Sequence, residues 1–96
     1  MGEKELLKEI EETGCMLYQN KEHEAIKKVA ELLGIFQNMI KNQTQEQLAL
    51  GGKFALVMLR ELLEAYQSLD MLGMADCLKE KAALVVQFYF QNMEYA

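Results

Sequence analysis

The chain has 96 residues, of which 51% are hydrophobic and 26% charged, and it contains no proline or tryptophan. This length allows one domain, 1–96, and the apolar fraction is too high for a disordered segment. Fifteen acidic against ten basic residues give a net charge of −5. With no basic stripe in the sequence, nucleic acid and anionic membranes are poor candidates as partners.

Two amphipathic helices are predicted in the first half of the chain. The first covers residues 3–19, because its apolar residues recur three and four apart: Leu6, Leu7, Ile10, Gly14, Leu17 and Tyr18. Asn20 interrupts this pattern and is a good N-cap for the second helix, which should run to Asn42. The inward face of that helix is predicted to hold Ile26, Val29, Ala30, Leu33, Phe36 and Ile40.

The third predicted helix contains a glycine pair. Thr44 and Gln47 have the spacing of a capping box, which places the start at Gln45. Gly51 and Gly52 favour a break, because two interior glycines cost about 2 kcal/mol relative to alanine. One helical register nevertheless continues through them: Leu48, Gly52, Ala55, Leu59, Leu62, Tyr66 and Leu69. We therefore expect one helix over 45–69 with the glycines facing the core, although the pair leaves a break as the alternative.

A fourth helix is predicted to follow Asp70, which can cap it, and to end near Asn92. Its inward row is predicted to be Leu72, Ala75, Leu78, Ala82, Val85, Val86 and Tyr89. Four helices joined by connections of a few residues are expected to lie antiparallel to their neighbours. The sequence thus predicts an all-α, up-down-up-down four-helix bundle.

Some apolar residues fall outside the predicted inward rows. On the fourth helix these are Leu84, Phe88 and Phe90, and on the second they are Leu32, Ile35 and Met39. Apolar surface beyond the needs of a core is typical of protein contact sites. These six residues are therefore the predicted partner or dimer contacts, the alternative being that they complete the core.

The sequence offers little chemistry for catalysis. His23 is the only histidine and lies among charges in the first turn of its helix, so we expect a surface residue. Paired acids on the third and fourth helices suggest one enzyme alternative, a metal-dependent nucleotide hydrolase using Glu61, Glu64, Asp76 and Glu80. Glu61 and Glu64 fall off the predicted core stripe, which favours solvated charges. We expect no enzyme, no catalytic residue, no metal and no cofactor.

The cysteines and the N-terminus bear on location. Cys15 and Cys77 are far apart in the sequence with no C-x-x-C motif, which favours two reduced thiols in the core over a disulfide. The charged start, with Glu3, Lys4 and Glu5, does not resemble a signal peptide, and no apolar run approaches the roughly 20 residues of a membrane span. A cytoplasmic location is expected.

Two segments carry a resemblance to a known group of proteins. The polar turn after Tyr18 followed by Glu24 and Ala25, and the pattern of Asp70, Ala75, Asp76 and Leu78, resemble small uncharacterised helical proteins of Firmicute bacteria. That likeness covers most of residues 5–92 and implies no established activity. A looser similarity links the chain to flagellar export chaperones, through the bundle and the helix–Asn-Lys–helix turn.

Together these patterns predict a non-catalytic bundle that acts through protein–protein contacts. We expect a homo-oligomer, a homodimer being the simplest form, or another protein as partner. The looser similarity implies a more specific alternative, a binder of a secreted protein akin to an export chaperone.

Overall fold

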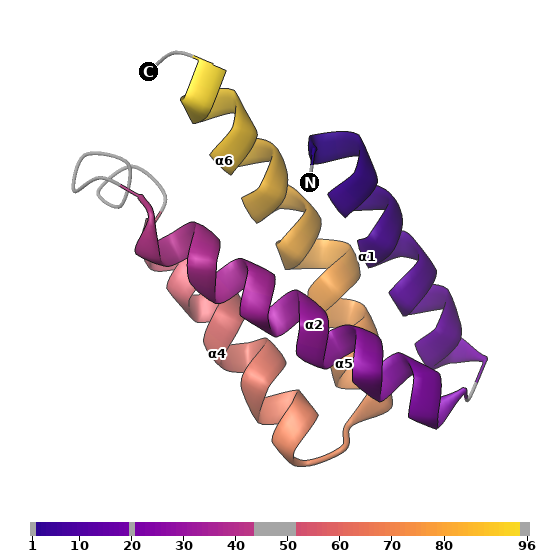
Figure 1. Ribbon diagram of the computed structural model, residues 1–96. Coiled ribbons are helices and arrows are strands. Elements are labelled where there is room, and N and C mark those ends of the chain that lie inside the picture. The colour runs from indigo at the N-terminus through magenta and orange to yellow at the C-terminus, as the bar shows by residue number, and fades with distance from the viewer. Residues whose placement is uncertain (1, 20, 44–51, 95–96) are drawn as a thin grey trace.

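Four helical stretches make up the part of the chain that the computed structural model describes, residues 2–19, 21–43 and 52–94 (Figure 1). Helix α1 covers Glu3–Tyr18, α2 covers Glu22–Lys41 and α4 covers Lys53–Gln67. The last stretch joins α5 (Met71–Cys77), a π-helical turn η2 (Leu78–Ala82) and α6 (Ala83–Glu94). These residues form no strand, so the predicted all-α class is confirmed.

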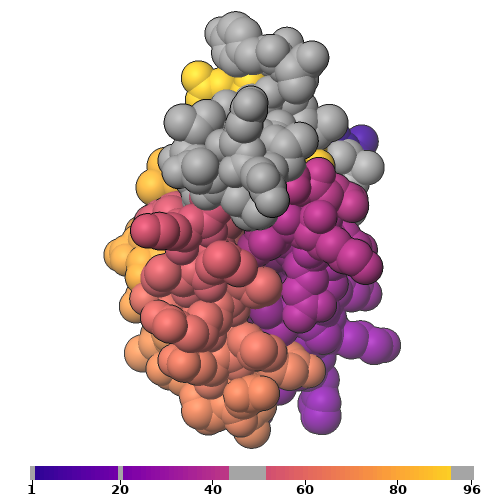
Figure 2. Space-filling model, turned by 90° about the vertical axis from the view of Figure 1, so that its left-hand side faces the viewer, coloured from indigo at the N-terminus to yellow at the C-terminus, as the bar shows by residue number. Residues whose placement is uncertain are grey.

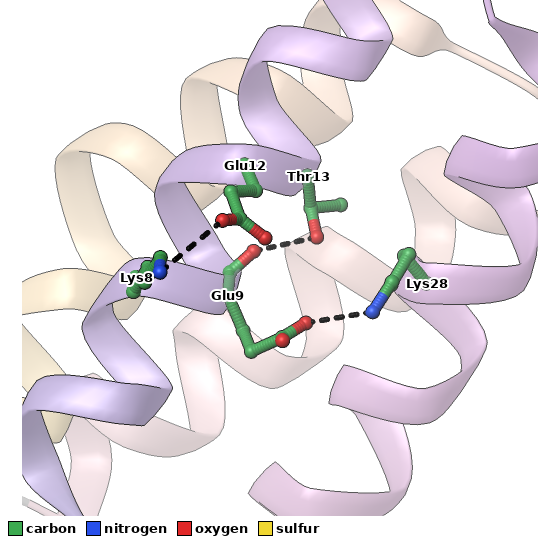
Figure 3. Close-up of polar contacts among 5 residues, drawn as sticks. All are labelled: Lys8, Glu9, Glu12, Thr13 and Lys28. Atoms are coloured by element: carbon green, nitrogen blue, oxygen red, sulfur yellow. Dashed lines mark hydrogen bonds and ion pairs between the residues drawn. The ribbon is translucent and has the colours of Figure 1, made fainter.

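Helix α1 is amphipathic, as its spacing predicts. Leu6, Ile10 and Leu17 are buried on one face. Thr13 is buried on the same face, where its hydroxyl donates a hydrogen bond of 2.7 Å to the carbonyl oxygen of Glu9 (Figure 3). Tyr18 is about half exposed, so its predicted place in the core is wrong. It lies in the last turn of the helix, at the edge of the packed region.

A salt bridge joins α1 to α2. Lys28 Nζ lies 2.9 Å from Glu9 Oε2, across the space between the two helices (Figure 3). Lys8 and Glu12 form a looser pair of 4.0 Å along α1 itself. Exposed pairs of this kind contribute little to stability, so the packing of apolar side chains holds these helices together.

Helix α2 buries more of its surface than predicted. Val29, Leu33 and Phe36 are buried as expected, whereas Ala30 is exposed. Leu32 and Met39 are only 2% and 8% exposed. They complete the core because α2 packs between α1 and α4, so its buried face is wider than one contact requires. Lys21 occupies the N-cap position, and Asn20 lies outside the described residues.

Helix α4 begins directly after Gly52, which is buried at the N-cap position. The predicted start at Gln45, the capping box and Gly51 lie outside the described residues. Met58 and Leu62 are fully buried on the inward face. Of the predicted inward row, Ala55 and Leu62 are buried as expected, whereas Leu59 and Tyr66 are half-buried.

The connection from α4 to α5 is a tight C-cap followed directly by an N-cap. The Asp70 amide donates to the carbonyl of Ala65 at 2.8 Å, and the Leu69 amide donates to the carbonyl of Tyr66 at 3.2 Å. This pair of bonds defines a Schellman motif, with Leu69 in the left-handed region at φ 57°. Leu69 points away from the bundle and is 60% exposed, so its predicted core position is wrong.

Asp70 caps α5, as the sequence predicts. Its Oδ1 accepts a hydrogen bond of 2.9 Å from the amide of Gly73. A Cβ at Gly73 would lie 2.4 Å from the other carboxylate oxygen, so the glycine leaves room for the cap. Leu72, predicted to point inward, is 63% exposed because it lies in the first turn, beyond the end of the core. Met74 is buried in its place.

The π turn keeps one face of the last stretch buried. The last helical stretch has four fully buried residues spaced by four: Met74, Leu78, Ala82 and Val86. In a regular α-helix three such steps drift about 120° around the axis. The wider turn at Leu78–Ala82 offsets this drift, so all four side chains meet the core.

The helices surround a single core in which every helix has two principal neighbours. Helix α1 packs against α2 and α5, and α4 packs against the same two helices. Figure 2 shows α2 and α4 side by side over one face of the molecule. The last turn of α1, the first turn of α2 and the α4–α5 connection gather at one end, whereas α1 begins and α6 ends toward the other (Figure 1).

Candidate protein-contact site

The six predicted contact residues divide by exposure. Leu84 is 56% exposed on α6, whereas Phe88, Phe90 and Ile35 are half-buried. Leu32 and Met39 belong to the core, so their prediction as surface contacts is corrected: they pack inside the bundle. Of the six predicted contact residues, the exposed one therefore lies on α6 and none lies on α2.

Leu84 and Phe88 lie in a groove between α4 and α6 of about 400 Å³, here named the α4–α6 groove. Phe54 of α4 forms part of the opposite wall and is 42% exposed. The other residues that line the groove are Gln43, Ala55, Val85, Gln87 and Gln91. Among the described residues, none that lines the groove is charged, and the polar groups are glutamine side chains.

Phe90 and Ile35 lie elsewhere. With Met39 they line a shallower hollow of about 360 Å³ between α1, α2 and α6. Tyr89 packs edge-on against Phe90 there, with ring centroids 5.3 Å apart and planes at 84°. The predicted contact residues of α6 therefore face two different surfaces, since Leu84 and Phe88 are separated from Phe90 around the helix.

The sequence explains why α6 offers apolar side chains in two directions. From Ala82 to Met93 it contains no charged residue, and large apolar residues occur on more than one face. A helix that is apolar all round is normally buried on all sides. Here Leu84 stays exposed, which makes the α4 side of α6 the strongest candidate contact surface.

Phe54 was missed by sequence reasoning. It lies one residue before Ala55 of the inward row and belongs to an uncharged run that ends at Leu59. A large apolar residue outside the inward row is the same signal that singles out Leu84 and Phe88, so the sequence pattern also contained Phe54. Leu56 is a second exposed apolar residue of α4.

Two of the four acids of the enzyme alternative, Glu61 and Asp76, are used in other contacts. Glu61 forms an ion pair with Lys81 of the π turn. Asp76 accepts a hydrogen bond of 3.2 Å from the hydroxyl of Tyr18, on the α1 side of the bundle. Within residues 2–19, 21–43 and 52–94, no three His, Cys, Asp or Glu side chains are grouped as a metal would require. The described acids therefore do not form the two facing pairs that this alternative needs.

The remaining reactive residues are separate from the groove. His23 is exposed in the first turn of α2, as expected. Both cysteines carry free thiols, but only Cys77 is buried, so the predicted core position of Cys15 is wrong. Burial and the nearby Glu61 raise the pKa of Cys77 to about 11, although Lys81 opposes them. A thiol with this pKa is unreactive at neutral pH.

Comparisons with models of protein families, with curated proteins and with solved structures find no match. The similarities to Firmicute helical proteins and to flagellar export chaperones therefore stay predictions. The described helices include none that is long and apolar enough to cross a membrane.

Proposed function

We propose that this chain is a non-catalytic helical bundle that acts through contacts with other proteins and forms a homodimer through the α4–α6 groove. The observation that carries the proposal is the chemistry of that groove. Phe54, Leu84 and Phe88 give it large apolar side chains, and none of the lining residues that the structure describes is charged. Exposed Leu84, on a helix without charge from 82 to 93, identifies the side that a partner would cover.

A second copy fits this groove better than a charged partner. Each copy carries a net charge of −5, so two copies repel one another at long range. A homodimer is therefore favoured only through surfaces that add no further negative charge, as this groove allows. Glutamine both donates and accepts hydrogen bonds. In a two-fold dimer, where the same patch contributes from both sides, Gln87 and Gln91 can therefore pair with their own counterparts.

The proposal includes a topology and a location. We propose that the four helical stretches run up-down-up-down and antiparallel, which the gathering of helix ends in Figure 1 supports. A cytoplasmic location is supported by the exposed free thiol of Cys15, since such thiols persist in reducing compartments. The acidic net charge supports a protein partner over nucleic acid or an anionic membrane.

Sedimentation equilibrium tests the dimer with a matched pair of variants. Leu84→Glu places a charge in the groove, whereas Leu72→Glu places one on an equally exposed leucine about 18 Å away along the same helical stretch. The unmodified chain should be dimeric at micromolar concentration. Leu84→Glu should weaken self-association about tenfold or more, which corresponds to about 1.4 kcal/mol, and Leu72→Glu should leave it unchanged.

Two results would contradict the proposal. The first is an unmodified chain that stays monomeric at high micromolar concentration. The second is an equal effect of Leu84→Glu and Leu72→Glu, which would show that added negative charge, rather than the groove, controls association. Circular dichroism of both variants establishes that each remains helical.

A further inference from the structure

A second groove lies between α1 and the last helical stretch, and we name it the α1 groove. It encloses about 420 Å³ and has an apolar floor. The floor residues are Leu7, Ile10, Gly14, Ala75, Leu78 and Ala83. Tyr18 stands at one end, where its hydroxyl donates to Asp76 and so joins α1 to α5.

The shape of the floor suits a helix. Three of its six residues are glycine or alanine, and a Cβ built on Gly14 would meet no heavy atom within 4 Å. Small side chains let a helix axis approach to about 8 Å. From Leu7 to Tyr18 the groove follows α1 for about 16 Å, the length of three helical turns.

Gly14 has no other evident use in the fold. An interior glycine costs a helix about 1 kcal/mol relative to alanine, and no neighbouring atom requires its small size. Gly34 of α2 is equally free of neighbours but is exposed and lines none of the described grooves. Gly34 therefore provides a matched control for Gly14.

Three acidic residues lie on or beside the α1 groove, and one of them, Glu11, lines it. Glu11 lies on its wall, and Asp76 and Glu80 lie beside Tyr18, where the hydrogen bond to Asp76, desolvation and the two negative charges raise the pKa of the tyrosine. Among the ion pairs of the described residues none includes Glu11, Asp76 or Glu80. Among the described residues that line the groove, Lys79 is the one base and Glu11 the one acid.

We propose that the α1 groove binds one amphipathic helix of a partner protein, about three turns long and basic along the edges that flank its buried face. Its small or apolar face would lie over Gly14 and Ala83, with lysine or arginine side chains directed toward Glu11, Asp76 and Glu80. A second copy of this chain is a poorer occupant because its net charge is −5. This role is independent of the α4–α6 groove and goes beyond the proposed dimer.

A synthetic peptide tests the proposal by nuclear magnetic resonance. The probe is a helical peptide of about 14 residues, with alanine and leucine on one face and lysine on the other. The control peptide has glutamate in place of every lysine. In the amide spectrum of the full-length chain, the lysine peptide should shift the Gly14 resonance and leave Gly34 unchanged, and the glutamate peptide should shift neither.

Variants separate the shape of the groove from its charge. Gly14→Leu should lower the affinity for the lysine peptide about tenfold, because a leucine occupies the space of the bound helix, whereas Gly34→Leu should leave it unchanged. Glu11→Lys should lower the affinity for the lysine peptide and raise the affinity for the glutamate peptide.

An unshifted Gly14 resonance, equal binding of the two peptides, or equal effects of Gly14→Leu and Gly34→Leu would overturn the proposal. A change of oligomeric state in Gly14→Leu would assign the groove to a second copy and overturn it as well. A monomeric unmodified chain that still binds the lysine peptide at Gly14 would contradict the dimer only.

Discussion

Among the described residues other than glycine, Leu69 is the one with a positive φ. Its φ of 57° lies in the left-handed region, which costs residues with a Cβ about 1–2 kcal/mol. Because its side chain is exposed, Leu69→Gly should lose little packing and remove this cost. We expect the free energy of unfolding to rise by about 1 kcal/mol, measured by urea denaturation.

Leu72 provides the control for this substitution. It is equally exposed but lies in helical conformation in α5, where glycine lowers stability by about 0.5–1 kcal/mol. The same leucine-to-glycine change should therefore raise the free energy of unfolding at position 69 and lower it at position 72. If Leu69→Gly and Leu72→Gly both destabilise the chain, the left-handed residue is not strained.

Cys77 links stability to alkaline pH. Its pKa is about 11 in the folded chain against an ordinary value of 9.0, chiefly because the thiol is buried. Below pH 9 the thiol keeps its proton in both the folded and the unfolded chain, so its contribution to stability is fully present. As the pH rises from 9 to 11, the thiol loses its proton in the unfolded chain before it does so in the folded chain. The free energy of unfolding should fall by up to about 2 kcal/mol over this range.

Urea denaturation at pH 8 and pH 10.5 measures the alkaline effect. Cys77→Ala should reduce the loss of stability between the two pH values, since it removes the titrating group. Cys15→Ala is the control, because that thiol is exposed, and it should retain the loss seen in the unmodified chain. Equal losses in all three proteins would exclude Cys77 as the cause.

At the scale of helices, the sequence predicts where elements lie better than which face they bury. Helices α1 and α2 match the predicted ranges within about two residues, because their apolar spacing is regular and polar residues end them. The buried face depends on how many neighbours a helix has. Leu32 and Met39 look surplus on an isolated helix, but α2 packs between two partners and needs both.

The last helical stretch shows a second limit of periodicity. Leu78, Ala82 and Val86 lie on the predicted inward row, but a fixed period of 3.6 residues starts that row at Leu72 instead of Met74, because the π turn changes the period. Lys81 of that turn pairs with Glu61 of α4, a contact between residues far apart in the sequence. Local sequence therefore predicts the helix but not its change of winding.

The candidate site was predicted in part. Leu84 and Phe88 were identified because they lie off the inward row of α6, and both line the α4–α6 groove. Phe90 was grouped with them although it faces another hollow, since sequence distance does not give direction around a helix. The α1 groove could not be predicted, because it is formed by small residues of α1 and α5 that meet only in the folded chain.

At the scale of the whole molecule, the net charge opposes self-association and the apolar α4–α6 groove favours it. Each copy carries −5, so long-range repulsion opposes the dimer, while the surfaces proposed to meet contribute no charge of their own. Salt shortens the range of that repulsion, from about 30 Å at 0.01 M to about 10 Å at 0.1 M. Salt would weaken a dimer whose interface is held by ion pairs, because it screens their attraction.

We therefore expect sodium chloride to tighten self-association. Raising its concentration from about 20 mM to about 500 mM should lower the dimer dissociation constant several-fold, measured by sedimentation equilibrium. The melting temperature of Leu84→Glu, taken as the monomer, is the control and should change little, because the described ion pairs are exposed at least in part. A dissociation constant that rises with salt would place ion pairs in the interface and move it away from the α4–α6 groove.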